Sequence, residues 1–146
     1  MSLIKIYKDN PTAGLTDGTL VSSGDWTEPI HSGAIKVPET GFEEGAWIKL
    51  AVRCDSDFET VEEDAKHATL NIINTTHVDK WRLAPDDNDS PDELNAEDWG
   101  FSMDITTQIV DTNHIFWIQA RAEAGEEPQN DQSVQLQVEA VVGASD

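Results

Sequence analysis

The sequence is poor in cysteine and contains no long apolar run. Cys54 is the only cysteine among 146 residues, so no intrachain disulfide can form and the fold must rest on a packed core. Its place after Ile48, Leu50 and Val52 at a spacing of two predicts a buried thiol, which suits folding in a reducing cytoplasm. No stretch approaches the ~18 apolar residues of a membrane span, so we expect no membrane insertion. Met1–Tyr7 is too short and polar to be a secretory signal.

Basic residues are also scarce. Nine Lys and Arg stand against 29 Asp and Glu, which gives a net charge of −20. A nucleic-acid-binding protein needs clustered basic residues to displace counterions, so nucleic acid is excluded as a partner. The acidic residues cluster at Asp55–Asp64, Asp86–Asp98 and Glu123–Asp131, mainly between predicted strands. This charge favours solvation and prevents self-association, and a cationic partner or calcium remains an alternative.

Apolar and polar residues alternate with the period of a β-strand along much of the chain. The regular spacing of these short strands predicts an all-β protein, an antiparallel β-sandwich of immunoglobulin-like type, with a jelly roll as the alternative. One domain covers residues 1–146. The predicted strands are Leu3–Tyr7, Thr19–Val21, Ile30–Val37, Trp47–Cys54, Ala68–Ile73, Val78–Leu83, Trp99–Ile105, Ile115–Ala122 and Val134–Val142.

Three details of the arrangement follow from local signals. Ile115–Ala122 and Val134–Val142, joined by the polar segment Glu123–Ser133, predict a long antiparallel hairpin. Pro11 cannot donate to a ladder, so Leu3–Tyr7 is expected to end there or to form an edge strand. Glu39–Gly45 is predicted as a turn, Asp55–Lys66 as a loop, and Pro85–Asp98 as a long polar loop.

The acidic loop Asp86–Glu97 carries oxygen ligands at intervals close to those of a calcium-binding loop. Pro91 occupies the sixth position, where such a loop needs glycine, and no helix is predicted on either side. A solvated acidic loop is therefore favoured over calcium, which is the one cofactor considered. The candidate ligands are Asp86, Asn88, Ser90, Asp92 and Glu97.

No pattern in the sequence indicates catalysis. The four histidines, His31, His67, His77 and His114, show no metal-binding spacing. No serine lies in a nucleophile elbow, and no glycine-rich loop precedes a helix to hold phosphate. We therefore expect a protein that is not an enzyme and assign no catalytic residues.

The five tryptophans are the remaining candidates for a binding role. Trp81 and Trp99 fall on the apolar faces of their strands and are predicted to lie in the core. Trp47 and Trp117 fall on the opposite faces, together with Arg121, and these three residues are our candidates for a contact surface with another protein. Packing beneath a loop and stacking on sugar rings are the alternatives for the two tryptophans.

Several segments resemble a known group of proteins: IKIYKDNPTAG (Ile4–Gly14), TDGTLVSSGD (Thr16–Asp25), IKLAVRCDSDF (Ile48–Phe58), DKWRLAPD (Asp79–Asp86) and the C-terminal IFWIQARAEAGEEPQNDQSVQLQVEAVV. The chain resembles small structural proteins of tailed bacteriophages and prophages. The resemblance implies a virion component, such as a head-decoration, neck or tail-associated protein, made in the host bacterial cytoplasm. Its partners would be other virion proteins or further copies of itself in a homo-oligomer. The acidic central segments depart from the composition expected of this group.

Overall fold

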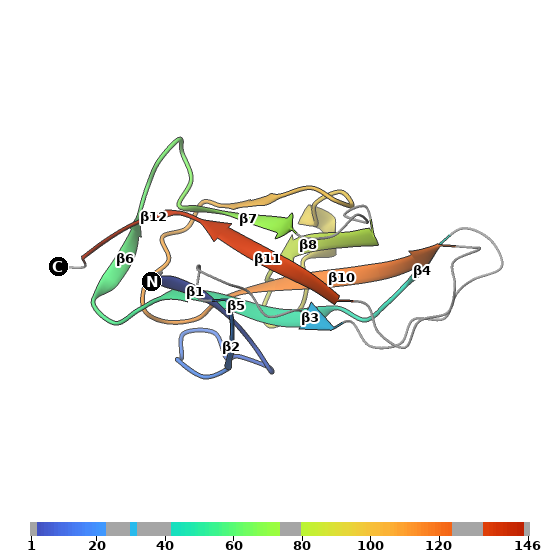
Figure 1. The fold of residues 1–146 in the computed structure, drawn as a ribbon, viewed down its shortest axis with the longest axis horizontal. Helices are drawn as coiled ribbons and strands as arrows, with labels where there is room; N and C mark the ends of the chain where they lie inside the picture. The colour runs from blue at the N-terminus through green and yellow to red at the C-terminus, as the bar shows by residue number, and fades with distance from the viewer. Residues whose placement is uncertain (1–2, 23–29, 32–41, 74–79, 124–132, 145–146) are drawn as a thin grey trace.

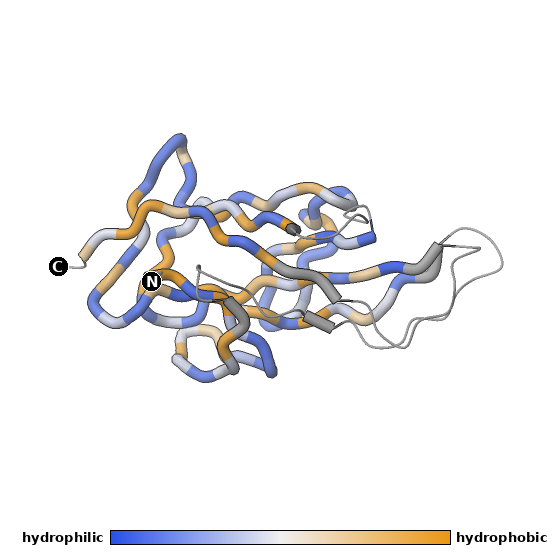
Figure 2. Tube along the Cα trace, viewed as in Figure 1, coloured by the Kyte–Doolittle hydropathy of each residue, from blue (hydrophilic) through white to orange (hydrophobic). Residues whose placement is uncertain are grey.

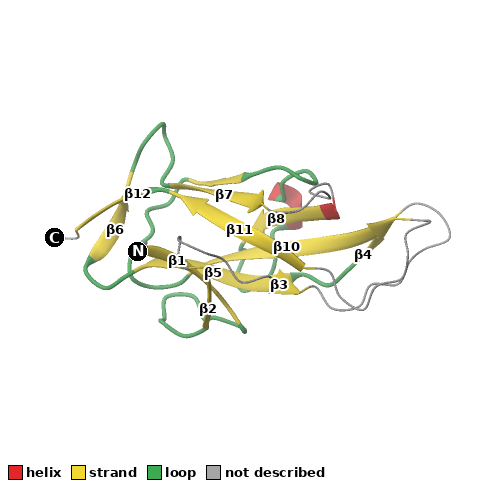
Figure 3. Ribbon diagram, in the orientation of Figure 1, coloured by secondary structure: helices red, strands yellow, loops and turns green. Residues whose placement is uncertain are grey.

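The computed structural model describes residues 3–22, 30–31, 42–73, 80–123 and 133–144. In these ranges the chain forms strands, the short 3-10 helix η2 and a 3-10 position at Lys80, which confirms the all-β prediction (Figure 3). The strands are β1 Ile4–Lys8, β2 Thr19–Ser22, β3 Ile30–His31, β4 Phe42–Glu44, β5 Ile48–Cys54, β6 Phe58–Val61, β7 Ala68–Ile73, β8 Trp81–Pro85, β9 Met103–Ile105, β10 His114–Glu123, β11 Ser133–Glu139 and β12 Val141–Ala144, and the helix is η2 Glu93–Asn95.

Two antiparallel sheets form the layers of a sandwich (Figure 1). The first has the strand order β2-β1-β5-β10-β4, and β8 pairs with the opposite edge of β10. The second has the order β3-β11-β7-β9, and β12 pairs with β6 in a small additional ladder. The antiparallel sandwich is therefore as predicted, while the immunoglobulin-like assignment stays a prediction.

The core lies between the two sheets. Alternation places one side chain in two on this inner face, and Figure 2 shows apolar positions interspersed with polar ones along the strands. β1, β5, β8 and β10 contribute the largest buried side chains of the first layer, and β7 and β11 contribute those of the second. The core includes Ile4, Ile6, Leu50, Val52, Cys54, Leu70, Trp81, Leu83, Met103, Ile105, Ile109, Phe116, Ile118 and Leu136.

The predicted C-terminal hairpin is wrong, although both of its strands exist. β10 pairs with β5, β4 and β8 in the first sheet, whereas β11 pairs with β7 and β3 in the second. Both edges of β10 are already occupied, so the chain crosses to the other layer. Residues 124–132 of the connection lie outside the described residues. A crossing between layers accounts for a connection much longer than a hairpin needs.

Two predictions about the first half of the chain need correction. β1 ends at Lys8, before Pro11, which is one of the two expected outcomes; the other is wrong, because β1 lies between β2 and β5 and is not an edge strand. β1 ends where Asp9 and Asn10 adopt left-handed φ angles of 63° and 60°. The second correction is that β4 and β6 are strands in segments predicted as a turn and a loop. Of the strand predicted at Ile30–Val37, Ile30 and His31 form β3, and residues 32–41 lie outside the described part of the chain.

The register opposite β10 places a β-bulge between β4 and β5. Ile118 pairs with Ile48 and Arg121 pairs with Glu44, so residues 119 and 120 of β10 face residues 45, 46 and 47. The extra residue shifts the alternation by one position and leaves both Glu44 and Trp47 on the side of the sheet away from the core. The Gln119 side chain donates to the Gly45 carbonyl at 2.8 Å and so closes the bulge.

Candidate functional site

The first sheet presents a row of large polar and aromatic side chains on the side away from the core. The register places Trp117 opposite Lys49 on β5, and Gln119 opposite Arg82 on β8. Because residues two apart on a strand share a face, Arg121 lies on the same side as Trp117 and Gln119. We call this surface the outer face; it comprises Glu44, Trp47, Lys49, Arg82, Trp117, Gln119 and Arg121.

Arginine and tryptophan side chains stack alternately across the outer face. The Arg82 guanidinium lies 4.9 Å from the centre of the Trp47 ring and 4.6 Å from that of Trp99. The Arg121 guanidinium lies 4.2 Å from the Trp99 ring centre. Each such contact contributes about 0.5–1 kcal/mol at an exposed site. We call Trp47, Arg82, Trp99 and Arg121 the tryptophan–arginine ladder.

Arg82 is fixed at the centre of this ladder by two further contacts. Its Nε donates to Gln119 Oε1 at 2.8 Å, and one terminal nitrogen lies 3.6 Å from a Glu44 carboxylate oxygen. A guanidinium can make these bonds in its plane while its faces stack on indoles, which an ammonium cannot do. The ladder is therefore held at Arg82 by a hydrogen bond and an ion pair as well as by stacking.

The acidic segment 86–97 packs over the outer face. The Trp117 indole donates to Asp86 Oδ1 at 2.8 Å, and the Trp47 indole donates to Glu93 Oε1 at 3.0 Å. Lys49 forms an ion pair with Asp89. Trp47 and Trp117 thus lie on the predicted face and pack beneath a loop, one of the predicted alternatives. Arg121 lies in the ladder, and a contact of these three residues with another protein stays a prediction.

The prediction that Trp99 lies in the core is wrong. β9 begins only at Met103, and Gly100, with a φ of 88°, turns the chain while its N–H donates to the Trp81 carbonyl at 2.8 Å. Trp99 therefore lies in the ladder, and Phe101 is 60% exposed. Trp81 is buried as predicted. Trp26 lies outside the described residues.

The candidate calcium ligands begin in a tight hairpin. Asn88 and Asp89 have φ angles of 54° and 66°, and the Asp87 N–H donates to the Ser90 carbonyl at 2.8 Å, as in a two-residue type I′ turn. Asp86 accepts from the Trp117 indole and from the Asp89 N–H. The Ser90 hydroxyl donates to the Asp87 carbonyl at 2.7 Å. These oxygen atoms are engaged in holding the hairpin together.

The remaining candidates lie after the hairpin. Asp92 caps η2 and accepts from the Asn95 side chain at 2.8 Å. Glu97 lies beyond η2, where its N–H donates to the Leu83 carbonyl. Within the described ranges no three His, Cys, Asp or Glu side chains are grouped as metal ligands would be. The structure therefore distributes the five candidates along the segment, and calcium binding stays a prediction.

Two of the calcium candidates, Asp86 and Glu97, line one cavity of about 440 Å³ together with Asn95, Asp104 and His114. Burial raises the pKa of Glu97, and the nearby carboxylates of Asp104 and Asp98 raise it further. Burial lowers the pKa of His114, and the Asp86 carboxylate opposes this shift. Both shifts favour the neutral forms, and partial desolvation of the cavity is their common cause.

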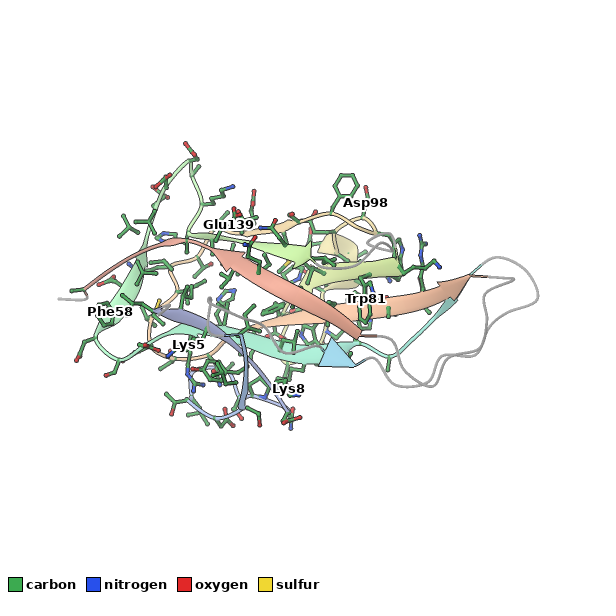
Figure 4. All side chains as sticks on the ribbon, viewed as in Figure 1. Lys5, Lys8, Phe58, Trp81, Asp98 and Glu139 are labelled. Atoms are coloured by element: carbon green, nitrogen blue, oxygen red, sulfur yellow. The ribbon has the colours of Figure 1, made fainter. Side chains whose placement is uncertain are left out.

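A second cavity, of about 470 Å³, lies beside the outer face and is lined by Lys8, Asp9, Asn10, Trp47, Ile48, Lys49, Asp89 and Trp117. We call it the tryptophan pocket. Figure 4 shows Lys8, which lies at the end of β1. Because Tyr7 pairs with Ala51, the residues that follow Tyr7 approach Lys49. Lys8, Asp9 and Asn10 were absent from the sequence candidates, since Asp-Asn-Pro indicated only a turn.

The side chains of Cys54 and His67 both make contacts within the fold. Cys54 is 2% exposed, as predicted, and its thiol donates to the Ile109 carbonyl at 3.6 Å. Burial, followed by the charge of Asp55, raises the pKa of Cys54 to about 11. His67 Nδ1 lies 3.0 Å from Thr60 Oγ1. His77 lies outside the described residues.

Comparison of the chain with protein-family models, curated proteins and solved structures gives no significant match. In the ranges that the structure describes, no helix is long and apolar enough to span a membrane.

Proposed function

We propose that this chain is a non-enzymatic structural protein of a tailed-phage or prophage virion, a head-decoration, neck or tail-associated component. It works by binding other virion proteins or further copies of itself. The resemblance of Ile4–Gly14, Ile48–Phe58 and the C-terminal strands to such proteins supports this assignment. The antiparallel sandwich is compatible with it.

The observation that carries the proposal is the tryptophan–arginine ladder. Tryptophan and arginine dominate the binding energy of protein interfaces, because both combine a large flat contact area with hydrogen-bonding groups. Here Arg82 and Arg121 stand on the adjacent strands β8 and β10, and they stack on Trp47 and Trp99 from the neighbouring loops. Little side-chain entropy is lost when a partner covers groups that are already ordered. The ladder thus offers a contact surface whose side chains are already ordered before a partner binds.

The charge of the chain supports the same assignment. A net charge of −20 makes free copies repel one another, so association requires a specific contact. A lattice of virion proteins repeats that contact many times, and bivalent or multivalent attachment turns a weak contact into stable assembly.

The test is binding to virion particles that lack this protein. We expect saturable co-sedimentation at a stoichiometry that matches the particle lattice. The double variant Trp99→Ala/Arg121→Ala should weaken binding, whereas Leu15→Ser should not, because Leu15 is an exposed residue on the loop before β2, at the opposite end of the sheet. Absence of the protein from purified virions, or equal binding by both variants, would contradict the proposal.

A further inference from the structure

We propose that the tryptophan pocket binds a neutral pyranose sugar, with Trp47 and Trp117 contacting the apolar faces of the ring and Lys8, Asp9 and Asn10 bonding its hydroxyl groups. This inference is independent of the virion assignment. It rests on the cavity and on the groups that line it.

The shape and lining of the pocket suit a small ligand. Its volume of about 470 Å³ falls within the ~300–1,000 Å³ range of small-molecule sites. Two indoles in one cavity supply broad apolar surfaces, and the neighbouring side chains supply polar groups. A pyranose has this same division, since its C–H groups form apolar faces while its hydroxyls project from the rim.

Both indoles are already held in place. The Trp117 indole donates a hydrogen bond to Asp86, and the Trp47 indole donates one to Glu93. The Arg82 guanidinium lies over the Trp47 ring. The indole N–H groups therefore need no new partner, and the apolar parts of the rings that line the pocket are what remains for a ligand. Binding to rings that are already ordered costs little conformational entropy.

The polar groups on the β1 side of the pocket are available. Within the described residues, no hydrogen bond or ion pair engages the side chains of Lys8, Asp9 or Asn10, and Asp9 and Asn10 are exposed. Together they offer ammonium and amide donors and carboxylate and amide acceptors, the complement of sugar hydroxyls. Asp9 and Asn10 hold consecutive left-handed conformations, which aspartate and asparagine adopt more readily than other non-glycine residues.

The charges in the pocket select for a neutral ligand. Lys8 and Lys49 are balanced by Asp9 and Asp89, and Lys49 is paired with Asp89. The surrounding protein is strongly acidic and would repel sialylated, sulfated or phosphorylated glycans. Hexoses, N-acetylhexosamines and their disaccharides are thus the expected ligands.

The test is titration of the full chain with glucose, galactose, mannose, N-acetylglucosamine and their β-linked disaccharides. Saturation-transfer NMR and tryptophan fluorescence report binding. We expect at least one sugar to bind saturably, and Trp47→Ala to abolish the signal. Asp9→Gly/Asn10→Gly retains a residue suited to positive φ at both positions while removing both side chains. Removing both side chains deletes the hydrogen bonds of a carboxylate and of an amide, so sugar binding should weaken by about tenfold or more.

Phe101→Ala is the matched control, because Phe101 is an exposed aromatic residue that belongs neither to the pocket nor to the ladder. It should leave sugar binding unchanged, and circular dichroism confirms that each variant is folded. No saturable response to any sugar in the panel would overturn the proposal, as would binding that survives Trp47→Ala or that Phe101→Ala removes equally. Particle binding is tested separately through Trp99 and Arg121, neither of which lines the pocket.

Discussion

The Trp117 indole N–H donates a hydrogen bond of 2.8 Å to Asp86 Oδ1, and this bond joins the first sheet to the acidic hairpin above it. Trp117 belongs to β10, in the middle of the sheet, and Asp86 is the first residue after β8. The contact therefore determines where the segment that covers the outer face begins.

Trp117→Phe tests this bond, because phenylalanine keeps an aromatic ring and removes the donor. We expect the free energy of unfolding to fall by about 1–2 kcal/mol, since the partly buried Asp86 carboxylate loses a donor. Amide exchange in the hairpin should become faster. Urea denaturation and hydrogen exchange measure the two effects. Trp47→Phe is the control. The Glu93 carboxylate that accepts from the Trp47 indole is exposed, so this substitution should lower the free energy of unfolding by less. Equal effects of both substitutions would contradict this role of Asp86.

Arg82→Lys tests the ladder. Lysine keeps the charge but cannot stack between Trp47 and Trp99 while it also bonds Gln119. We expect a loss of about 1.5–3.5 kcal/mol in the free energy of unfolding, from two cation–π contacts and one hydrogen bond. Denaturant midpoints measure it.

Lys66→Ala is the comparison for Arg82→Lys. It removes an ion pair with Asp104 of 3.5 Å in which both side chains are more than a third exposed. Such a pair contributes at most about 1 kcal/mol. A larger loss for Lys66→Ala than for Arg82→Lys would show that the ladder is not a stabilising unit.

Local alternation was sufficient to predict strands but not their partners. The alternation in Ala68–Ile73 predicts β7 with the bounds that the structure has. β6 could not be found in this way, because it has only four residues and is held by pairing with β12, whose residues lie 80 to 86 positions later in the chain. The pairing of β10 and β11 depended equally on distant strands that occupy their edges.

The site was predictable to a similar extent. The spacing placed Trp47 and Trp117 away from the core correctly, because each lies in or beside a regular strand. Trp99 was misplaced because Gly100 ends the alternation. The proximity of Lys8–Asn10 to the tryptophans follows from the β1–β5 register, which no local pattern reveals.

Calcium should not raise the melting temperature of this protein beyond the effect of magnesium. The carboxylates of Asp86 and Asp92 already accept hydrogen bonds from Trp117 and Asn95, and these bonds would compete with a cation. Differential scanning calorimetry in calcium, magnesium and chelator, at constant ionic strength, measures the effect. The magnesium sample controls for the general screening of an acidic chain. A rise specific to calcium would instead support a calcium-stabilised adhesion-type module.

Glu97→Gln should stabilise the protein at pH 7. Burial and the charges of Asp104 and Asp98 raise the pKa of Glu97, so the folded state binds its proton more tightly than the unfolded chain does. Stability from this group is present below its ordinary pKa of 4.5 and is lost as pH rises through the folded pKa. The advantage of the variant should therefore disappear below pH 4.5. Glu62→Gln, at an exposed carboxyl outside the cavity, should give no such gain.

His114 should make the fold sensitive to mild acid. Burial lowers the pKa of its imidazole in the folded state, and the Asp86 carboxylate only partly opposes this. Below the ordinary pKa of 6.5 the unfolded chain therefore binds a proton that the folded chain does not, and the free energy of unfolding falls as pH decreases. His114→Gln removes this titration but leaves all others. Urea denaturation of the unsubstituted protein and of His114→Gln between pH 7.5 and pH 5.5 isolates the effect. Below pH 6.5 the free energy of unfolding should fall more steeply for the unsubstituted protein than for the variant. A difference that stays constant across this range would show that His114 titrates alike in the folded and unfolded chains.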